Sequence, residues 1–233
     1  MRLRLRSTKL GKVRFVGHRD MARLWDRTLR RLGAPVAFTR GFTPRPRIAF
    51  GLALPMGAES LAEYIDIELD GGIGIDVGGL PDELSALLPD GVDVTAAALV
   101  DPAADSLQAV VTACTWELWS DELTAGRLDD AIGLLDHDEL LVERERKRER
   151  RVDDIRPLLL DLRTTGERLV AELATTGRAL RPSELSGLAF PDIDPLDVRV
   201  LRINQWTSHD GARREVLTPR ALPVAAHHRE VGA

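Results

Sequence analysis

Hydrophobic and polar positions follow two clear periods in the first half of the chain. Residues 2–7 have the period of a half-buried strand, with Leu3 and Leu5 on the apolar side and Arg2, Arg4 and Arg6 on the solvated side. Residues 62–69 alternate aliphatic with mostly acidic side chains, which is also the period of a strand. Residues 18–32 place apolar side chains three or four positions apart, which predicts an amphipathic helix ending at Gly33. Shorter elements complete the half: strands at 13–16, 35–39, 47–54 and 92–100, and a helix at 81–88.

The second half repeats this order of elements after a linker at residues 101–105. Strands are expected at 109–119, 140–145, 158–163, 168–174 and 198–206, and helices at 121–135 and 182–188. Strand–helix–strand–strand–helix–strand, twice, predicts an α+β protein of tandem ferredoxin-like (βαββαβ) α/β sandwiches. The two domains are expected at 1–101 and 106–207, followed by a mobile tail at 208–233.

Charge is distributed unevenly over the 233 residues. The whole chain carries −5, yet residues 1–50 hold 14 Lys or Arg against two acids, a local balance of +12. Residues 51–100 hold ten acids and no Lys or Arg. The basic segment therefore predicts an anionic ligand or partner, or neutralisation by the acidic remainder of the chain. No apolar run approaches the roughly 20 residues of a membrane span, and no signal peptide is evident, so a cytoplasmic protein is expected.

Two segments gather the arginines into candidate binding sites. The helix at 18–32 places Arg19, Arg23 and Arg27 on one side, with Arg30 and Arg31 continuing the row. The segment 39–47 carries three more arginines around a Gly-Phe-Thr-Pro turn, where guanidinium groups bind phosphates and a phenyl ring stacks on a base. The residues predicted to bind RNA or another anion are Arg14, His18, Arg19, Arg23, Arg27, Arg40, Phe42, Arg45 and Arg47. A solvated helix face without a ligand is the alternative for the helical row.

His18 is the candidate catalytic group, because a histidine among arginines is favoured in its neutral form and can act as a general base. The alternative is a histidine that orders the turn before the helix. The remaining histidines and the single cysteine, Cys114, have no spacing typical of metal ligands, so no metal site is expected. Cys114 lies in an apolar strand and is expected to be buried.

Several short motifs resemble those of the bacterial radical-SAM-linked proteins, which are fused to or encoded beside radical SAM proteins. The match is dense over residues 12–68 and rests on four segments, RFVGHRD from Arg14, RTLRR from Arg27, GFTPRPR from Gly41 and LPMGAES from Leu54. Looser similarity follows at 154–157 and 181–182. Gly17, Arg19 and Arg45 depart from the family pattern, where Ser, Leu and His are common; the last departure weakens a two-histidine scheme.

The resemblance implies an accessory protein and not the radical SAM enzyme itself. One cysteine cannot supply the three thiolates of a [4Fe–4S] cluster, so no cofactor is expected. The leading hypothesis is a non-catalytic RNA-binding or substrate-presenting partner of a radical SAM enzyme, acting in tRNA or rRNA modification. The alternatives are a metal-independent RNA-processing enzyme using His18, and a protein–protein adaptor. The sequence leaves the substrate, the reaction and the oligomeric state open.

Overall fold

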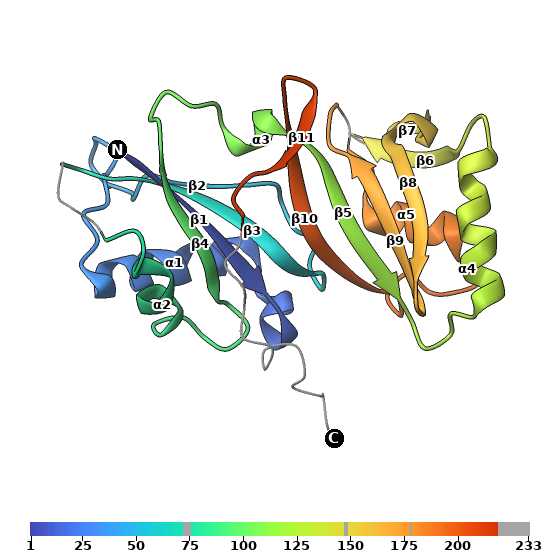
Figure 1. The fold of residues 1–233 in the computed structure, drawn as a ribbon, viewed down its shortest axis with the longest axis horizontal. Coiled ribbons are helices and arrows are strands. Elements are labelled where there is room, and N and C mark those ends of the chain that lie inside the picture. The colour runs from blue at the N-terminus through green and yellow to red at the C-terminus, as the bar shows by residue number, and fades with distance from the viewer. Residues whose placement is uncertain (72–75, 147–148, 178, 219–233) are drawn as a thin grey trace. The chain divides into compact units, whose positions relative to one another are not determined.

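A computed structural model describes residues 1–71, 76–146, 149–177 and 179–218 and shows a mixed α+β protein (Figure 1). The chain divides into two compact units. Unit 1 comprises Met1–Met56, Ala62–Gln108 and the segment from Leu217, and unit 2 comprises Gly57–Leu61 and Ala109–Val216. No helix within these described ranges is long and apolar enough to cross a membrane.

The described part of unit 1 has its strands and longer helices in the order β1, α1, β2, β3, α2, β4. Their bounds are β1 Arg2–Lys9, α1 His18–Leu32, β2 Ile48–Phe50, β3 Glu59–Glu68, α2 Leu80–Ser85 and β4 Val94–Val100. The strands lie in the order β4-β1-β3-β2, and β1 with β4 and β2 with β3 pair antiparallel. The first residues of β3 belong to unit 2. The helix at 18–32 and its end at Gly33, which adopts φ 74°, agree with the sequence prediction.

The core of unit 1 lies between one face of this sheet and the two helices. Alternate residues of β1 and β3 point to this face, including Leu3, Leu5, Ile65 and Ile67, all of them buried. Trp25 and Leu29 of α1 and Leu84 of α2 pack against them. The apolar stripe of α1 is therefore buried, as its spacing predicted, and its arginines remain on the opposite side.

The other face of β1 departs from the sequence prediction. Arg4 and Arg6 were expected on a solvated side of the strand, but both are buried. The Arg4 guanidinium donates two hydrogen bonds to Asp66 of β3, at 2.7 and 2.8 Å, and Arg6 donates to the Leu217 carbonyl. Arg2 donates to two backbone carbonyls of the 101–105 segment. Arg4 and Arg6 therefore belong to the interior of unit 1, whereas Arg2 is only half-buried.

Unit 2 repeats the same element order with an inserted hairpin. Its elements are α3 Leu107–Val110, at the junction, β5 Val111–Trp119, α4 Ala125–Ile132, β6 Leu141–Arg146, β7 Glu149–Asp154, β8 Leu159–Thr165, β9 Arg168–Ala174, α5 Pro182–Ala189, β10 Arg199–His209 and β11 Ala212–Glu215. The main strands lie in the order β10-β5-β9-β8 and pair antiparallel. Glu59 and Ser60 of β3 pair in parallel with β10, so the sheet is mixed. Cys114 is buried, as predicted.

The inserted hairpin includes residues of the run 143–151, in which every side chain is charged. β6 and β7 pair over this run, and Arg144 is buried. Its guanidinium donates to both carboxylate oxygens of Glu184 in α5, at 2.8 and 2.6 Å. Glu184 also accepts from the Arg181 backbone N–H at the start of α5. One charged side chain of the run thus connects the hairpin to a helix.

Two short predictions were wrong, and a strand that was not predicted lies within the expected tail. Residues 13–16 lie in a 3₁₀ turn, Gly11–Phe15, which places Val13 and Val16 one turn apart against the core. Residues 35–39 make isolated bridges and no strand, because the prolines around them supply no N–H to a ladder. The tail begins with a strand, β11, joined to β10 by a turn at Asp210-Gly211, and both residues have positive φ. The rest of the predicted tail, 219–233, lies outside the described residues.

Candidate functional site

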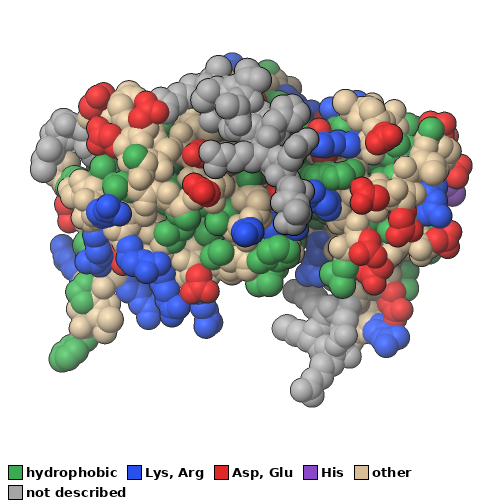
Figure 2. Space-filling view, turned by 90° about the horizontal axis from the view of Figure 1, so that it is seen from below, with side chains coloured by type: hydrophobic (Ala, Val, Ile, Leu, Met, Phe, Trp, Pro, Cys, Tyr) green, Lys and Arg blue, Asp and Glu red, His purple; other side chains and the backbone are tan. Residues whose placement is uncertain are grey.

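The exposed side of α1 carries a row of arginines. Arg19, Arg23 and Arg27 follow one another at four-residue spacing, and all three are exposed, as are Arg30 and Arg31. The buried stripe of Met21, Trp25, Thr28 and Leu29 fixes the rotation of the helix and hence this exposure. Figure 2 shows Lys and Arg side chains gathered at the lower left of that view, over unit 1.

Local acids neutralise only part of this row. Arg23 pairs with Asp20 at 3.0 Å and Arg30 with Asp26 at 2.9 Å, both on the solvent side. Within the described residues, no ion pair engages Arg19 or Arg27. Exposed pairs of this kind contribute about 0.5 kcal/mol to stability and are screened by salt.

The 39–47 segment follows the C-terminal end of α1 and forms a closed turn. The Thr39 N–H donates to the Arg45 carbonyl, and the Arg45 N–H donates to the Thr39 hydroxyl, so the two arms are held together. Phe42 lies within the turn with its side chain fully in solvent, at 110% relative exposure. Arg40 and Arg45 are exposed and make no ion pair with another described residue, whereas Arg47 pairs with Glu68. The Arg30 guanidinium lies 5.1 Å from the Phe38 ring centre, which links α1 to the base of the turn.

Arg14 lies apart from these groups. Its side chain is half-buried, and its guanidinium lies over the exposed Phe15 ring at 4.5 Å. We define the arginine surface as Arg19, Arg23, Arg27, Arg40, Phe42, Arg45 and Arg47. Of the predicted binding residues, His18 and the arginine row lie on α1, and Arg14 lies in the 3₁₀ turn that precedes it. Arg45 and Arg47 of the turn line a separate hollow with Arg2, Asp66 and Glu68.

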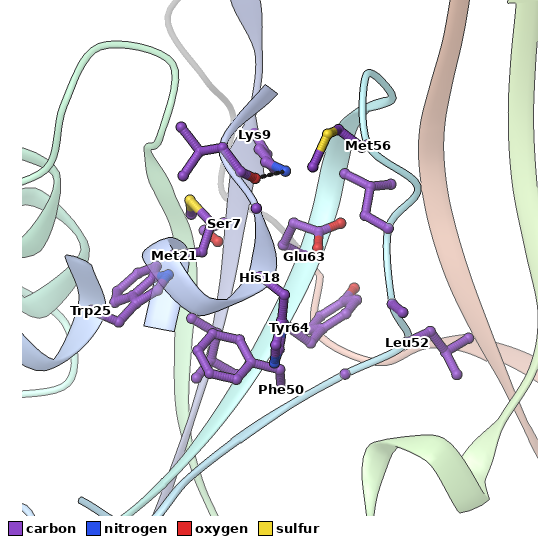
Figure 3. A pocket seen from close by; sticks show the side chains of 16 residues that line it. Ser7, Lys9, His18, Met21, Trp25, Phe50, Leu52, Met56, Glu63 and Tyr64 are labelled. Carbon is purple, nitrogen blue, oxygen red and sulfur yellow. Dashed lines mark hydrogen bonds between the residues drawn. The ribbon is translucent and has the colours of Figure 1, made fainter. Parts of the chain in front are cut away.

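His18 begins α1 and lines a cavity of about 250 Å³. Its imidazole meets the Phe50 ring edge to face, with ring centres 4.9 Å apart. Trp25 and Met21 of α1 form part of the wall, and Met56, at 74% relative exposure, lies at the opening. Figure 3 shows the Lys9 and Glu63 side chains on one side of this cavity and the His18 ring beside Phe50, directed away from them.

Two charged side chains of this pocket were missed by the sequence reading. Lys9 of β1 is buried, and its ammonium donates to the Val16 and Arg14 carbonyls at 2.9 and 3.4 Å. Glu63 of β3 is half-buried. Strand alternation places Lys9 on the side of Leu3 and Leu5, and Glu63 on the side of Ile65 and Ile67. Both charged residues therefore occupy strand positions on the same side as the buried apolar residues, and this pattern was the signal in the sequence that could have identified them.

The pocket combines flat apolar walls with one ammonium, one carboxylate and one imidazole. Such a lining accommodates a planar ligand that carries both donors and acceptors on its edge. Across the described ranges, no group of three or more His, Cys, Asp or Glu side chains is arranged to hold a metal ion.

The motif at 154–157 has a structural explanation. The Asp154 carboxylate accepts from the Leu140 and Arg156 backbone N–H groups at 2.8 and 2.9 Å, and these bonds lower the pKa of Asp154. The Arg156 guanidinium donates to the carbonyls of Leu135, His137 and Leu159. Together these bonds fasten the connection that leads from the hairpin to β8.

Comparison with known families identifies one match, and comparison with curated proteins finds none. Residues 2–182 match the family described as "Uncharacterized protein conserved in bacteria (DUF2344)". The matched range contains the arginine surface, the His18 pocket and the 154–157 motif. The chain therefore belongs to this bacterial family, DUF2344.

Proposed function

We propose that the protein is an accessory RNA-binding protein that uses the arginine surface. The observation that carries the proposal is the exposure of Arg19, Arg27, Arg40 and Arg45, none of which forms an ion pair within the described chain. Guanidinium groups at helical spacing bind successive phosphates, and an exposed phenyl ring stacks on an unpaired base. Phe42 supplies that ring from a turn closed by its own hydrogen bonds.

The partner proposed for this protein is a radical SAM enzyme. The proposal rests on the resemblance of residues 12–68 to the radical-SAM-linked proteins, and the reaction class is tRNA or rRNA modification. The protein would present RNA, since its one cysteine cannot hold an iron–sulfur cluster.

We also propose that each unit has a ferredoxin-like fold. The support is the element order βαββαβ in unit 1, with strand order β4-β1-β3-β2, and the equivalent order β10-β5-β9-β8 in unit 2. Sheets of this type offer RNA a rigid support, but the fold alone does not specify a function.

Filter binding of bulk tRNA at two salt concentrations tests the main proposal. The variant Arg19→Gln/Arg23→Gln/Arg27→Gln is expected to lose about tenfold or more in affinity and to flatten the slope of log affinity against log salt by about 2, since each lost phosphate contact removes 0.7 to 0.9. The matched control is Arg150→Gln/Arg151→Gln/Arg163→Gln, which removes the same charge from exposed positions of unit 2. Equal losses in both variants, or wild-type binding without a salt slope, contradict the proposal.

An RNA-processing enzyme using His18 is the second candidate, favoured by the position of His18 in a pocket with Glu63 and Lys9. This candidate requires that the protein cleaves the RNA that it binds. His18→Ala must then abolish cleavage while RNA binding remains. If the protein is instead a protein–protein adaptor, a protein partner is expected to co-purify with it and to remain bound after nuclease treatment.

A further inference from the structure

We infer that the His18 pocket receives a single unpaired nucleobase of the bound RNA, and that guanine fits it best. This inference rests on the proposed RNA binding and adds the recognised group. The pocket and the arginine surface meet at the start of α1, because His18 lines the pocket and Arg19 is the next residue.

The size of the pocket selects one ring system. A cavity of about 250 Å³ lies below the roughly 300 to 1,000 Å³ of pockets that hold drug-sized ligands, so it has room for a base without its neighbours. The rings of His18 and Phe50 and the thioether of Met56 supply flat or deformable apolar walls. Aromatic side chains are the usual stacking partners of an unstacked base in single-stranded RNA, and a methionine sulfur also makes favourable contacts with aromatic rings.

The charged groups favour guanine among the bases. A carboxylate accepts two parallel hydrogen bonds from the N1–H and N2–H of guanine, and an ammonium donates to its O6. Glu63 and Lys9 supply these two groups, and Figure 3 shows both directed into the cavity. The two carbonyl acceptors at Val16 and Arg14 hold the Lys9 ammonium in place.

The position of α1 connects the pocket to phosphate binding. The arginine row begins one residue after His18 and continues for the length of a 15-residue helix, about 22 Å. That length matches a few nucleotides of single strand. Single-stranded RNA that binds along the arginines of α1 therefore places one base near the pocket without a conformational change in the protein.

The experiment measures full-length protein binding to a uridine octamer with one central guanosine, and to octamers with inosine, adenosine or an abasic site in that place. Guanosine is expected to bind about tenfold tighter than the abasic site, with inosine between them because it lacks the N2 amino group. Glu63→Gln is expected to remove the preference for guanosine over inosine. The control, Glu83→Gln, changes the same charge on an exposed residue of α2 outside the pocket and is expected to keep it.

The outcomes separate this inference from the proposed function. Salt-dependent binding of every octamer with equal affinity overturns the base pocket and leaves the arginine surface standing. Absence of salt-dependent binding to any octamer or to tRNA overturns both. A guanosine preference that survives Glu63→Gln overturns the assignment of the pocket. A preference lost equally in Glu83→Gln does so as well, since it traces to net charge.

Discussion

Gly91 shows how one residue can determine a connection in unit 1. Its φ is +91°, and a Cβ at this position would lie 2.2 Å from the Leu10 carbonyl oxygen. The Gly91 carbonyl in turn accepts from the Leu10 N–H at 2.8 Å. We expect Gly91→Ala to lower the free energy of unfolding by more than about 2 kcal/mol, because left-handed backbone strain adds to displacement of the β1 end. Urea denaturation measures the change.

The control for Gly91 is Gly126→Ala in α4, where the added methyl meets nothing within 4 Å. Alanine within a helix is favoured over glycine by about 0.5 to 1 kcal/mol, so this variant is expected to be at least as stable as the wild type. Equal stabilities of the two variants would show that the close approach to Leu10 costs nothing.

At the level of elements, the β6–β7 hairpin and α5 depend on Glu184. Arg144 is almost fully buried, with 3% of its side chain exposed; Glu184 accepts its two short hydrogen bonds, and Asp153 accepts a longer one at 3.5 Å. Removing one partner of a buried pair typically costs 3 to 5 kcal/mol, and the Asp153 carboxylate compensates part of the Arg144 charge. We expect Glu184→Gln, which keeps the shape but not the charge, to cost about 2 kcal/mol or more.

Hydrogen exchange locates that effect. Amides of the hairpin and of α5 are expected to exchange faster in Glu184→Gln, because the bond that joins these two elements is weakened. The exposed pair Arg163–Asp161 provides the comparison: Asp161→Asn removes a surface ion pair and is expected to change stability by less than about 1 kcal/mol. A similar loss in both variants contradicts the structural role given to Glu184.

At the scale of the whole molecule, the basic residues of the N-terminal segment form two groups with different roles. Arg4 is buried against Asp66, whereas Arg19, Arg23 and Arg27 are in solvent. We expect Asp66→Asn to lower the unfolding free energy by about 3 kcal/mol or more while leaving RNA affinity of the folded protein unchanged. The triple Arg→Gln variant of α1 is expected to do the reverse, with stability within about 0.5 kcal/mol per site.

Denaturation and filter binding on the same preparations test this division. Binding that falls in Asp66→Asn at a temperature where the variant is fully folded places Asp66 or Arg4 in the binding surface instead. A loss of several kcal/mol in the α1 variant shows that its arginines stabilise the fold.

Elements with a local signal were predicted well, and those that depend on distant residues were not. The helix at 18–32 was correct to the residue because its period and its terminal glycine lie within one segment. β11 was missed although Asp210-Gly211 is a strong turn signal, because only four residues follow in the strand. Arg4 was expected in solvent since its partner, Asp66, lies 62 positions away in the chain.

The sequence alone determined the helices, most strands and the exposed arginine row of α1, because helical and strand periodicity depend on neighbours a few positions away. Tertiary structure decided which arginines are available to a ligand and where the pocket lies. Lys9, His18, Phe50 and Glu63 come from β1, α1, β2 and β3, so only strand order and register bring them together. Those are long-range choices, set by which strands pair and not by the residues beside each side chain.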